Sequence, residues 1–272
     1  MSKFFTDLGI LKTLTNNSYK AINIGMYDGT KYNYTHDCIS MIKNILECRH
    51  APLITELKLS SPSKGKIIDE NEIDLVYASR EMVNSGVVGI SILTQPYLFG
   101  GSIHNLATVR KHVSIPILMK DIIVSNVQIN AAKQIGADYI LLIKSVFDRN
   151  LAESDMENFI KFAHTKGLNI IYEVHTENEF KDVLEMDERN KDDLIGINNR
   201  NLSDLKVDLT ITERLLKNID KGKNIIISES GIHTPADLQY LKKCGADVFL
   251  IGTSIMESKD ISKKIQEFYN AF

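Results

Sequence analysis

Cysteine is scarce in this sequence of 272 residues, and its three copies, Cys38, Cys48 and Cys244, do not stand at the spacing of metal ligands. An odd number of cysteines also argues against a disulfide framework, so we interpret all three as reduced and structural. The chain has no HExxH, CxxC, GxSxG or Walker sequence either. These absences leave little support for metal-dependent or covalent hydrolytic chemistry.

Long apolar runs and an excess of positive charge are also missing. No segment approaches the ~18 consecutive apolar residues that span a bilayer, and the first fifteen residues lack the apolar core of a secretory signal. We therefore expect a cytoplasmic protein without a membrane-bound segment. The net charge is −3 and no basic run alternates with aromatic residues, which argues against nucleic acid as a partner. We expect a small-molecule ligand.

Eight short aliphatic runs recur along the chain. They cover residues 54–59, 88–94, 116–121, 138–143, 169–175, 194–199, 225–230 and 248–253, and their starts are 22 to 34 residues apart. The gaps hold stretches with helical periodicity and a glycine near the end, such as 71–86, 126–137 and 234–246. No linker rich in proline, glycine or serine interrupts them, so we expect one domain over residues 1–272.

The alternation of strands and helices predicts an α/β protein. Nearly continuous hydrophobic strands are typical of parallel sheets that are covered on both faces. Eight such units match the (β/α)8 TIM barrel, whereas doubly wound sheets have fewer strands as a rule. Residues 1–50 precede the first strand and include a helix-like piece at 38–50, so we expect an N-terminal helical extension packed on the barrel.

Polar residues stand at the ends of several predicted strands. In a (β/α)8 barrel the active site forms at the strand ends, and residues two apart on a strand share a face. The residues at these ends are Glu56, Lys58, Lys120, Glu173, Asn198, Arg200, Ser228 and Ser230. One charged strand end is more often solvated or ion-paired, but a repeated set of charges indicates an acid–base site. Neighbouring cations would lower the pKa of each lysine, and neighbouring carboxylates would raise it.

Glycine follows the last two predicted strands, with Gly231 in SESGI and Gly252 in LIGTS. In (β/α)8 barrels the turns after strands seven and eight commonly bind phosphate through backbone N–H groups at a helix start. One glycine in such a turn is a weak signal because many turns need a positive φ. The two together predict a phosphorylated ligand, for which Lys58 and Arg200 offer additional positive charge.

Six segments resemble the indole-3-glycerol phosphate synthase family in content and order: ELKLSSPSKG, ISILTQPYLFGGS, PILMKDIIVSNVQINAAKQIGADYILLI, YEVHTENEF, IGINNRNLSDLKVDL and SESGIHTPADLQYLKKCGADVFLIGTSIM. The combination of IGINNRNL with SESGI and SPSKG is far more specific than any single glycine motif. The resemblance implies a carboxy-lyase of tryptophan biosynthesis, with no metal and no organic cofactor. Its substrate would be 1-(2-carboxyphenylamino)-1-deoxyribulose 5-phosphate, which closes to indole-3-glycerol phosphate with loss of carbon dioxide and water. As partners we expect this phosphorylated substrate and, at most, a second copy in a weak homodimer.

The resemblance also implies catalytic roles, carried over by position in the motifs. Lys120 would be the general acid that polarises the ketone. Lys58 would hold the substrate carboxylate or phosphate and donate a proton in the dehydration. Glu173 would be the base of that elimination, and Glu56 would orient the lysines and could share in the proton transfer. Asn198 would position the hydroxyls and the carboxylate.

The same resemblance assigns substrate-binding residues. Arg200 would act together with Asn198, and Phe99 would form the wall against the aromatic ring. The other implied contacts are Ser61, Ser230, Gly231, Gly252 and Thr253, of which the last three would supply phosphate-binding amides. Leu59, Ile122 and the segment 95–98 depart from the usual family pattern, where an arginine, a phenylalanine and acidic residues stand.

Two other functions compete with this interpretation. Phosphoribosylanthranilate isomerase, another phosphate-binding barrel, would be expected to have a cysteine base near the end of the first strand, where this chain has Lys58. A catalytically silent subunit that scaffolds a pathway enzyme would be indicated by the loss of Lys120 or Glu173, and both residues are present. The synthase is therefore our main prediction.

Overall fold

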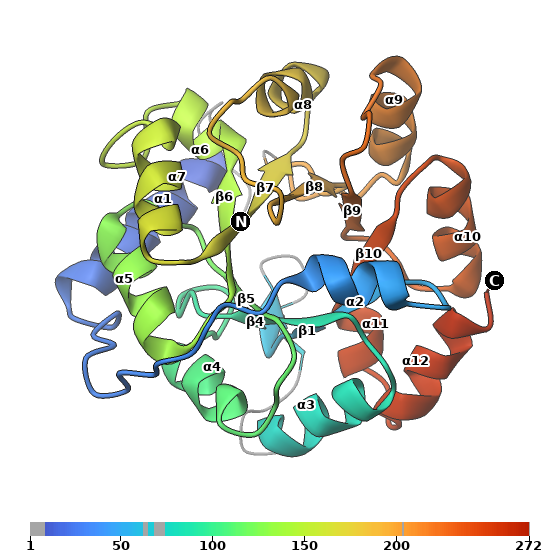
Figure 1. Ribbon diagram of the computed structural model, residues 1–272, viewed down its shortest axis with the longest axis horizontal. Helices are drawn as coiled ribbons and strands as arrows, with labels where there is room; N and C mark the ends of the chain where they lie inside the picture. The colour runs from blue at the N-terminus through green and yellow to red at the C-terminus, as the bar shows by residue number, and fades with distance from the viewer. Residues whose placement is uncertain (1–8, 62–64, 68–73, 203, 272) are drawn as a thin grey trace.

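Eight parallel strands close into a barrel, and helices surround it (Figure 1). The structure is a computed structural model that describes residues 9–61, 65–67, 74–202 and 204–271. The strands are β1 (Leu53–Leu57), β4 (Gly89–Leu93), β5 (Ile117–Lys120), β6 (Tyr139–Ile143), β7 (Asn169–Val174), β8 (Leu194–Asn198), β9 (Ile226–Glu229) and β10 (Val248–Ile251). They follow one another around the barrel in the order β1-β10-β9-β8-β7-β6-β5-β4, and β4 pairs with β1 to close it.

Each strand overlaps one of the eight aliphatic runs, and its ends differ from the predicted ones by no more than two residues. Nearly every residue of these strands is buried, because the outer side chains pack under the helices and the inner ones fill the barrel. Burial of one such aliphatic side chain contributes about 1.5–3 kcal/mol. The predicted (β/α)8 barrel is confirmed.

Most of the helices lie outside the barrel. They are α3 (Leu75–Asn84), α4 (Ile103–Arg110), α5 (Asn126–Ile135), α6 (Lys144–Asp148), α7 (Met156–Thr165), α8 (Glu177–Leu184), α9 (Thr210–Asn218), α10 (Pro235–Lys243), α11 (Thr253–Met256) and α12 (Ile261–Tyr269). Helix α5 illustrates how the sequence sets the bounds. Ser125 and Gln128 form a capping box at its start, and Gly136 ends it with φ +85°.

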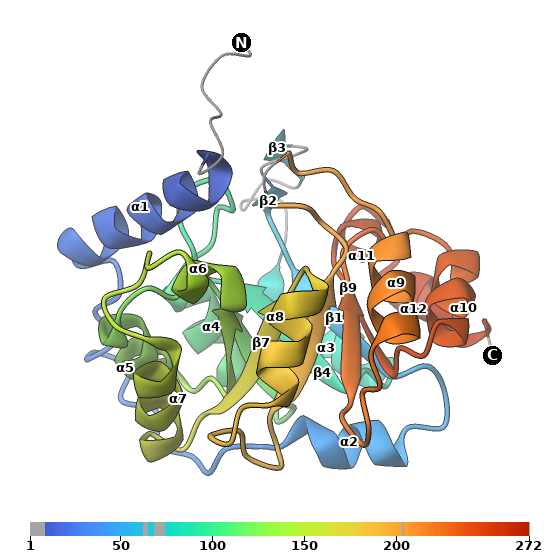
Figure 2. The ribbon, with the colours of Figure 1, turned by 90° about the horizontal axis from the view of Figure 1, so that it is seen from above.

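Two helices precede the barrel and lie at its opposite ends (Figure 2). Helix α2 (Met41–Glu47) covers the amino ends of the strands, where the backbone N–H of Met41 donates to the Tyr139 hydroxyl at 3.0 Å. Helix α1 (Gly9–Asn23) lies at the carboxyl ends, the same end as the small antiparallel pair β2 (Ser60–Ser61) and β3 (Gly65–Lys66). The helical extension is therefore confirmed, and its first helix lies at the end where the predicted site residues gather.

In the part of the chain that the structure describes, the helices are too short or too polar to cross a bilayer.

Candidate active site

A cavity of about 350 Å³ lies at the carboxyl ends of the barrel strands. Eleven of the twelve residues to which the family resemblance assigns a role line it: Glu56, Lys58, Phe99, Lys120, Glu173, Asn198, Arg200, Ser230, Gly231, Gly252 and Thr253. The twelfth, Ser61, has its backbone in β2, but its side chain lies outside the described part of the structure. Its contact with substrate stays a prediction.

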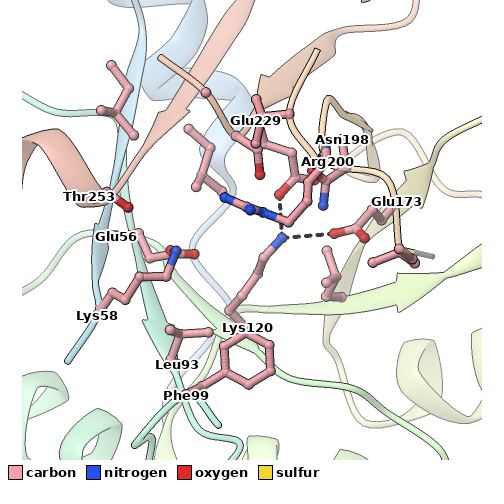
Figure 3. A pocket seen from close by; sticks show the side chains of 18 of the residues that line it. Glu56, Lys58, Leu93, Phe99, Lys120, Glu173, Asn198, Arg200, Glu229 and Thr253 are labelled. Atoms are coloured by element: carbon pink, nitrogen blue, oxygen red, sulfur yellow. Dashed lines mark hydrogen bonds and ion pairs between the residues drawn. The ribbon is translucent and has the colours of Figure 1, made fainter. Parts of the chain in front are cut away.

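Lys120 stands at the centre of the charged groups (Figure 3). It ends β5, and its amino group lies 3.0 Å from Glu173 Oε2 and also contacts the carboxylate of Glu229. Burial alone lowers the pKa of an amine, but Glu173, Glu229 and Glu56 outweigh that effect and raise the pKa of Lys120 above its ordinary value. The sequence left open whether neighbouring cations would lower this pKa or neighbouring carboxylates would raise it. The carboxylates have the larger effect, and Lys120 stays protonated.

Glu56 and Lys58 form a second ion pair beside this centre. The two residues lie two apart, so both side chains turn into the barrel, and Lys58 Nζ is 2.6 Å from Glu56 Oε1. The Ser91 hydroxyl donates to Glu56 Oε2 at 3.4 Å. Burial raises the pKa of the Glu56 carboxyl, but Lys58 and Lys120 more than offset this and lower it below its ordinary value. Glu56 is therefore an ionised acceptor at neutral pH.

The two carboxyl groups that contact Lys120 differ in their proton affinity. For Glu173, burial is outweighed by the positive charges of Lys120 and His175, so its pKa lies below the ordinary value. For Glu229, burial and the negative charge of Glu173 prevail over Lys120 and raise the pKa to about 7. When two carboxyl groups share one site, their pKa values commonly move apart in this way. At neutral pH the site thus holds an ionised acceptor and a group that exchanges its proton readily.

One wall of the cavity is apolar. It consists of Leu93, Phe99, Ile122, Leu141 and Ile143, which belong to β4, β5, β6 and the turns after them, together with Leu14 of α1. Of these strands, β6 and β5 lie across the barrel from β10 and β9, which carry the two glycine turns. A ligand with a flat apolar end and an anionic end can therefore span the cavity.

Glycine is required in both turns because other chain segments approach closely. Gly231 has φ +85°, and a Cβ atom there would lie 2.3 Å from Val207 Cγ1 of the loop after β8. At Gly252 a Cβ atom would lie 2.9 Å from Glu56 Oε1. Thr253 follows as the first residue of α11, where the first N–H groups of a helix have no partner within the helix. The turns can thus present backbone donors to an anion.

One predicted residue faces the wrong way, and one cavity residue was missed. The Ser228 hydroxyl lies outside the barrel, where it contacts the Asn199 side chain at 3.0 Å and the Thr212 hydroxyl at 2.9 Å. Glu229, its neighbour, faces inward instead. The sequence carried one signal of this: in β8, a Cβ atom at Gly196 would lie 2.7 Å from Glu229 Oε1, so that glycine makes room for the carboxylate.

Asp121, directly after Lys120, was also not predicted as a site residue. It lines the cavity and accepts hydrogen bonds from the Tyr27 hydroxyl at 2.8 Å and from Gln128 Nε2 at 3.2 Å, and it contacts the Thr94 hydroxyl. Burial raises the pKa of Asp121 to about 6, although these donors oppose the shift. Since Tyr27 follows α1, this network ties the N-terminal extension to the end of β5.

Comparisons with known proteins agree with this geometry. The family model for indole-3-glycerol phosphate synthase matches residues 17–268. The chain is 44% identical to the indole-3-glycerol phosphate synthase of Methanocaldococcus jannaschii over 227 residues, which cover 84% of this chain and 80% of the relative. It is 40% identical to that of Acetivibrio thermocellus, with 79% of each chain covered.

A solved structure shares the fold alone. Thiamine phosphate pyrophosphorylase from Pyrococcus furiosus superposes with a TM-score of 0.57 at 16% identity, and the match covers 81% of this chain and 95% of that one. The family assignment therefore rests on the sequence matches and on the residues in the cavity. The chain belongs to the indole-3-glycerol phosphate synthase family.

Proposed function

We propose that the cavity converts 1-(2-carboxyphenylamino)-1-deoxyribulose 5-phosphate to indole-3-glycerol phosphate, with loss of carbon dioxide and water. The observation that carries the proposal is the position of Lys120, whose amino group is held between Glu173 and Glu229 inside a cavity with an apolar wall. The other features of the cavity match the remaining parts of this substrate.

In the first step, the aromatic carbon that bears the carboxylate attacks the ketone carbon. A C–C bond forms, the ketone oxygen gains electron density, and Lys120 stabilises that oxygen and supplies its proton. Because the ring must be folded against the ketone, the apolar wall with Phe99 contributes by fixing the ring in that orientation. Carbon dioxide then leaves, and the electron pair of the broken bond returns to the ring.

In the second step, the hydroxyl group left from the ketone departs as water. Glu173 is suited to take the proton that this elimination releases, because its carboxylate is ionised at neutral pH. Lys58, paired with Glu56, is placed to donate a proton to the departing hydroxyl. Glu229, with a pKa of about 7, exchanges protons with Lys120 between the two steps.

The phosphate binds across the cavity from the reacting carbons. Gly231, Gly252 and Thr253 supply backbone donors, and Ser230 lies beside them. Asn198 and Arg200 extend from the end of β8 toward the middle of the cavity, where the carboxylate and the hydroxyls of the substrate would lie (Figure 3). Binding energy at this remote end constrains the reacting end.

The test is turnover of the substrate by purified protein, followed by the fluorescence of the indole product. Lys120→Ala is expected to lower kcat by about 10²-fold or more, with the fold intact by circular dichroism. Lys161→Ala, which removes an exposed lysine paired with Glu157 on α7, is the matched control and should keep wild-type activity. Folded wild-type protein without turnover would instead favour a silent scaffolding subunit, and near-normal rates for Lys120→Ala would remove that residue from its role.

The remaining expectations belong to the same proposal. As an enzyme of amino-acid biosynthesis, the protein is expected to act in the cytoplasm. We also expect one domain over residues 1–272, and a monomer or a weak homodimer. Light scattering at two protein concentrations measures the mass directly. A mass of two chains at the lower concentration would exclude a monomer.

A further inference from the structure

His175 lies directly after β7, next to Glu173 but outside the set of described residues that line the cavity. Its ring is enclosed by two carboxylates: Nε2 is 3.4 Å from Glu173 Oε1, and Nδ1 is 3.6 Å from Glu179 Oε2. The Glu173 oxygen on this side is not the one that Lys120 contacts. The ring and the lysine therefore hold the carboxylate of Glu173 from two sides.

Glu179 is itself held in place. The backbone N–H of His175 donates to Glu179 Oε2 at 2.6 Å, and the backbone N–H of Glu179 donates to the Thr176 hydroxyl, which caps the start of α8. The Thr176 hydroxyl thus caps the first turn of α8, and the Glu179 carboxylate is held by the backbone N–H of the residue before that cap. The second carboxylate near the imidazole is thus fixed by the backbone and does not depend on substrate.

The histidine ring is 10% exposed, and within the described residues neither of its nitrogens makes a hydrogen bond of good geometry. Burial of a neutral imidazole without a partner is unfavourable. An imidazolium between two carboxylates gains attraction on both sides. The charged form of His175 is the one that suits this position.

We infer that His175 is a positioning residue of the reaction, whose imidazolium ring keeps the carboxylate of Glu173 ionised and oriented with one oxygen toward Lys120. The inference rests on the proposed function, in which Glu173 is the base of the elimination. His175 acts through Glu173 and does not touch the substrate.

The surrounding charges agree with a cation at this position. Burial alone lowers the pKa of His175, but Glu179, Glu173 and Glu229 outweigh it and raise the pKa above its ordinary value. Lys120 contacts the other oxygen of Glu173 and also the carboxylate of Glu229.

The first experiment measures the pH profile of kcat for wild type and His175→Gln, which removes the charge and keeps a polar side chain of similar length. Loss of the cation raises the pKa of Glu173, so the acid limb of the profile should move up by about one pH unit, and kcat on the sloping part of that limb should fall about tenfold at a given pH. KM should change little, because the ring does not line the cavity.

The matched control is His164→Gln. His164 also lies beside a buried carboxylate, with Nε2 3.1 Å from Asp193 Oδ2, but it is in the last turn of α7, and Asp193 directly precedes β8, at the amino end of that strand. A general effect of removing a histidine–carboxylate contact would appear in both variants. A role in positioning Glu173 predicts a shifted acid limb in His175→Gln alone.

The second experiment does not depend on activity. Nuclear magnetic resonance follows the titration of the His175 ring in wild type and in Glu173→Gln, and the pKa of His175 should be above the ordinary value of about 6.5 and fall in the variant. A value at or below 6.5 in wild type would overturn the inference, whether or not the enzyme turns over. Active wild type with an unshifted His175→Gln profile would overturn it and leave the proposed function standing. Absence of wild-type turnover would count against the proposed function only.

Discussion

Replacement of Glu229 by glutamine tests the electrostatic arrangement around Lys120. Glutamine keeps the shape of the side chain and removes its charge. Glu229 is 2% exposed, and its pKa is raised to about 7 from an ordinary value of 4.5. Above pH 7 the folded protein therefore carries a buried carboxylate that burial and Glu173 both disfavour, whereas below about pH 4.5 the group is protonated in the folded and the unfolded chain.

The magnitude follows from the size of the shift. A change from 4.5 to about 7, at about 1.4 kcal/mol for each pKa unit, corresponds to about 3 kcal/mol. A raised carboxyl pKa destabilises the folded protein once the group ionises, so the cost is complete above pH 7 and absent at low pH. The free energy of unfolding of Glu229→Gln should therefore exceed that of wild type by about 3 kcal/mol at pH 8 and by about 1 kcal/mol at pH 5.

Urea unfolding followed by circular dichroism at the two pH values measures both differences. Glu185→Gln is the control, because Glu185 is an exposed glutamate just after α8. Exposed substitutions usually change stability by no more than about 0.5 kcal/mol, at either pH. If the difference between wild type and Glu229→Gln were the same at pH 5 and pH 8, Glu229 would titrate as it does in the unfolded chain, and the account of the paired carboxylates would be refuted.

Two further predictions concern buried polar groups beside the cavity. Gln95 is fully buried, and within the described residues its side-chain nitrogen and oxygen have no hydrogen-bond partner. Gln95→Met should therefore raise the free energy of unfolding by about 1–2 kcal/mol. A lower free energy of unfolding, measured with urea, would mean that the amide has hydrogen-bond partners. Tyr27→Phe removes a donor to Asp121, whose pKa is about 6, so it should destabilise the protein by about 1–2 kcal/mol at pH 8 and by less at pH 5, where Asp121 is mostly protonated. An equal loss at the two pH values would contradict the hydrogen bond to the ionised form.

The barrel was predictable because its signals are local. Strands that are covered on both faces read as continuous aliphatic runs, and the glycines between strand and helix mark where each unit turns. Lys120, Glu173 and Asn198 stand at the same place in their units, so the topology brings them to one end of the barrel. The spacing of the units alone was enough to gather the catalytic candidates.

The inward face of β9 was not predictable in the same way. A strand buried on both faces has no polar and apolar alternation, so nothing local distinguishes Ser228 from Glu229. Ser230 adds to the difficulty, since its φ of +70° departs from strand geometry. It therefore lines the cavity, although Ser228, two residues earlier, points outward. The usual rule that residues two apart share a face fails at that step.

The sign of the pKa shift of Lys120 depends on distances that sequence does not contain. Two lysines and two glutamates were expected at one end of the barrel, and Coulomb interactions at contact distance greatly exceed those one residue further away. The structure pairs Lys58 with Glu56. The negative charge of Glu56 therefore offsets most of the repulsion that Lys58 would exert on Lys120. Lys120 is left with two carboxylates, from β7 and β9, which lie far apart in the sequence. The proton affinity of the central amine is thus a property of the closed barrel, because only closure places Glu173 and Glu229 on either side of one nitrogen atom.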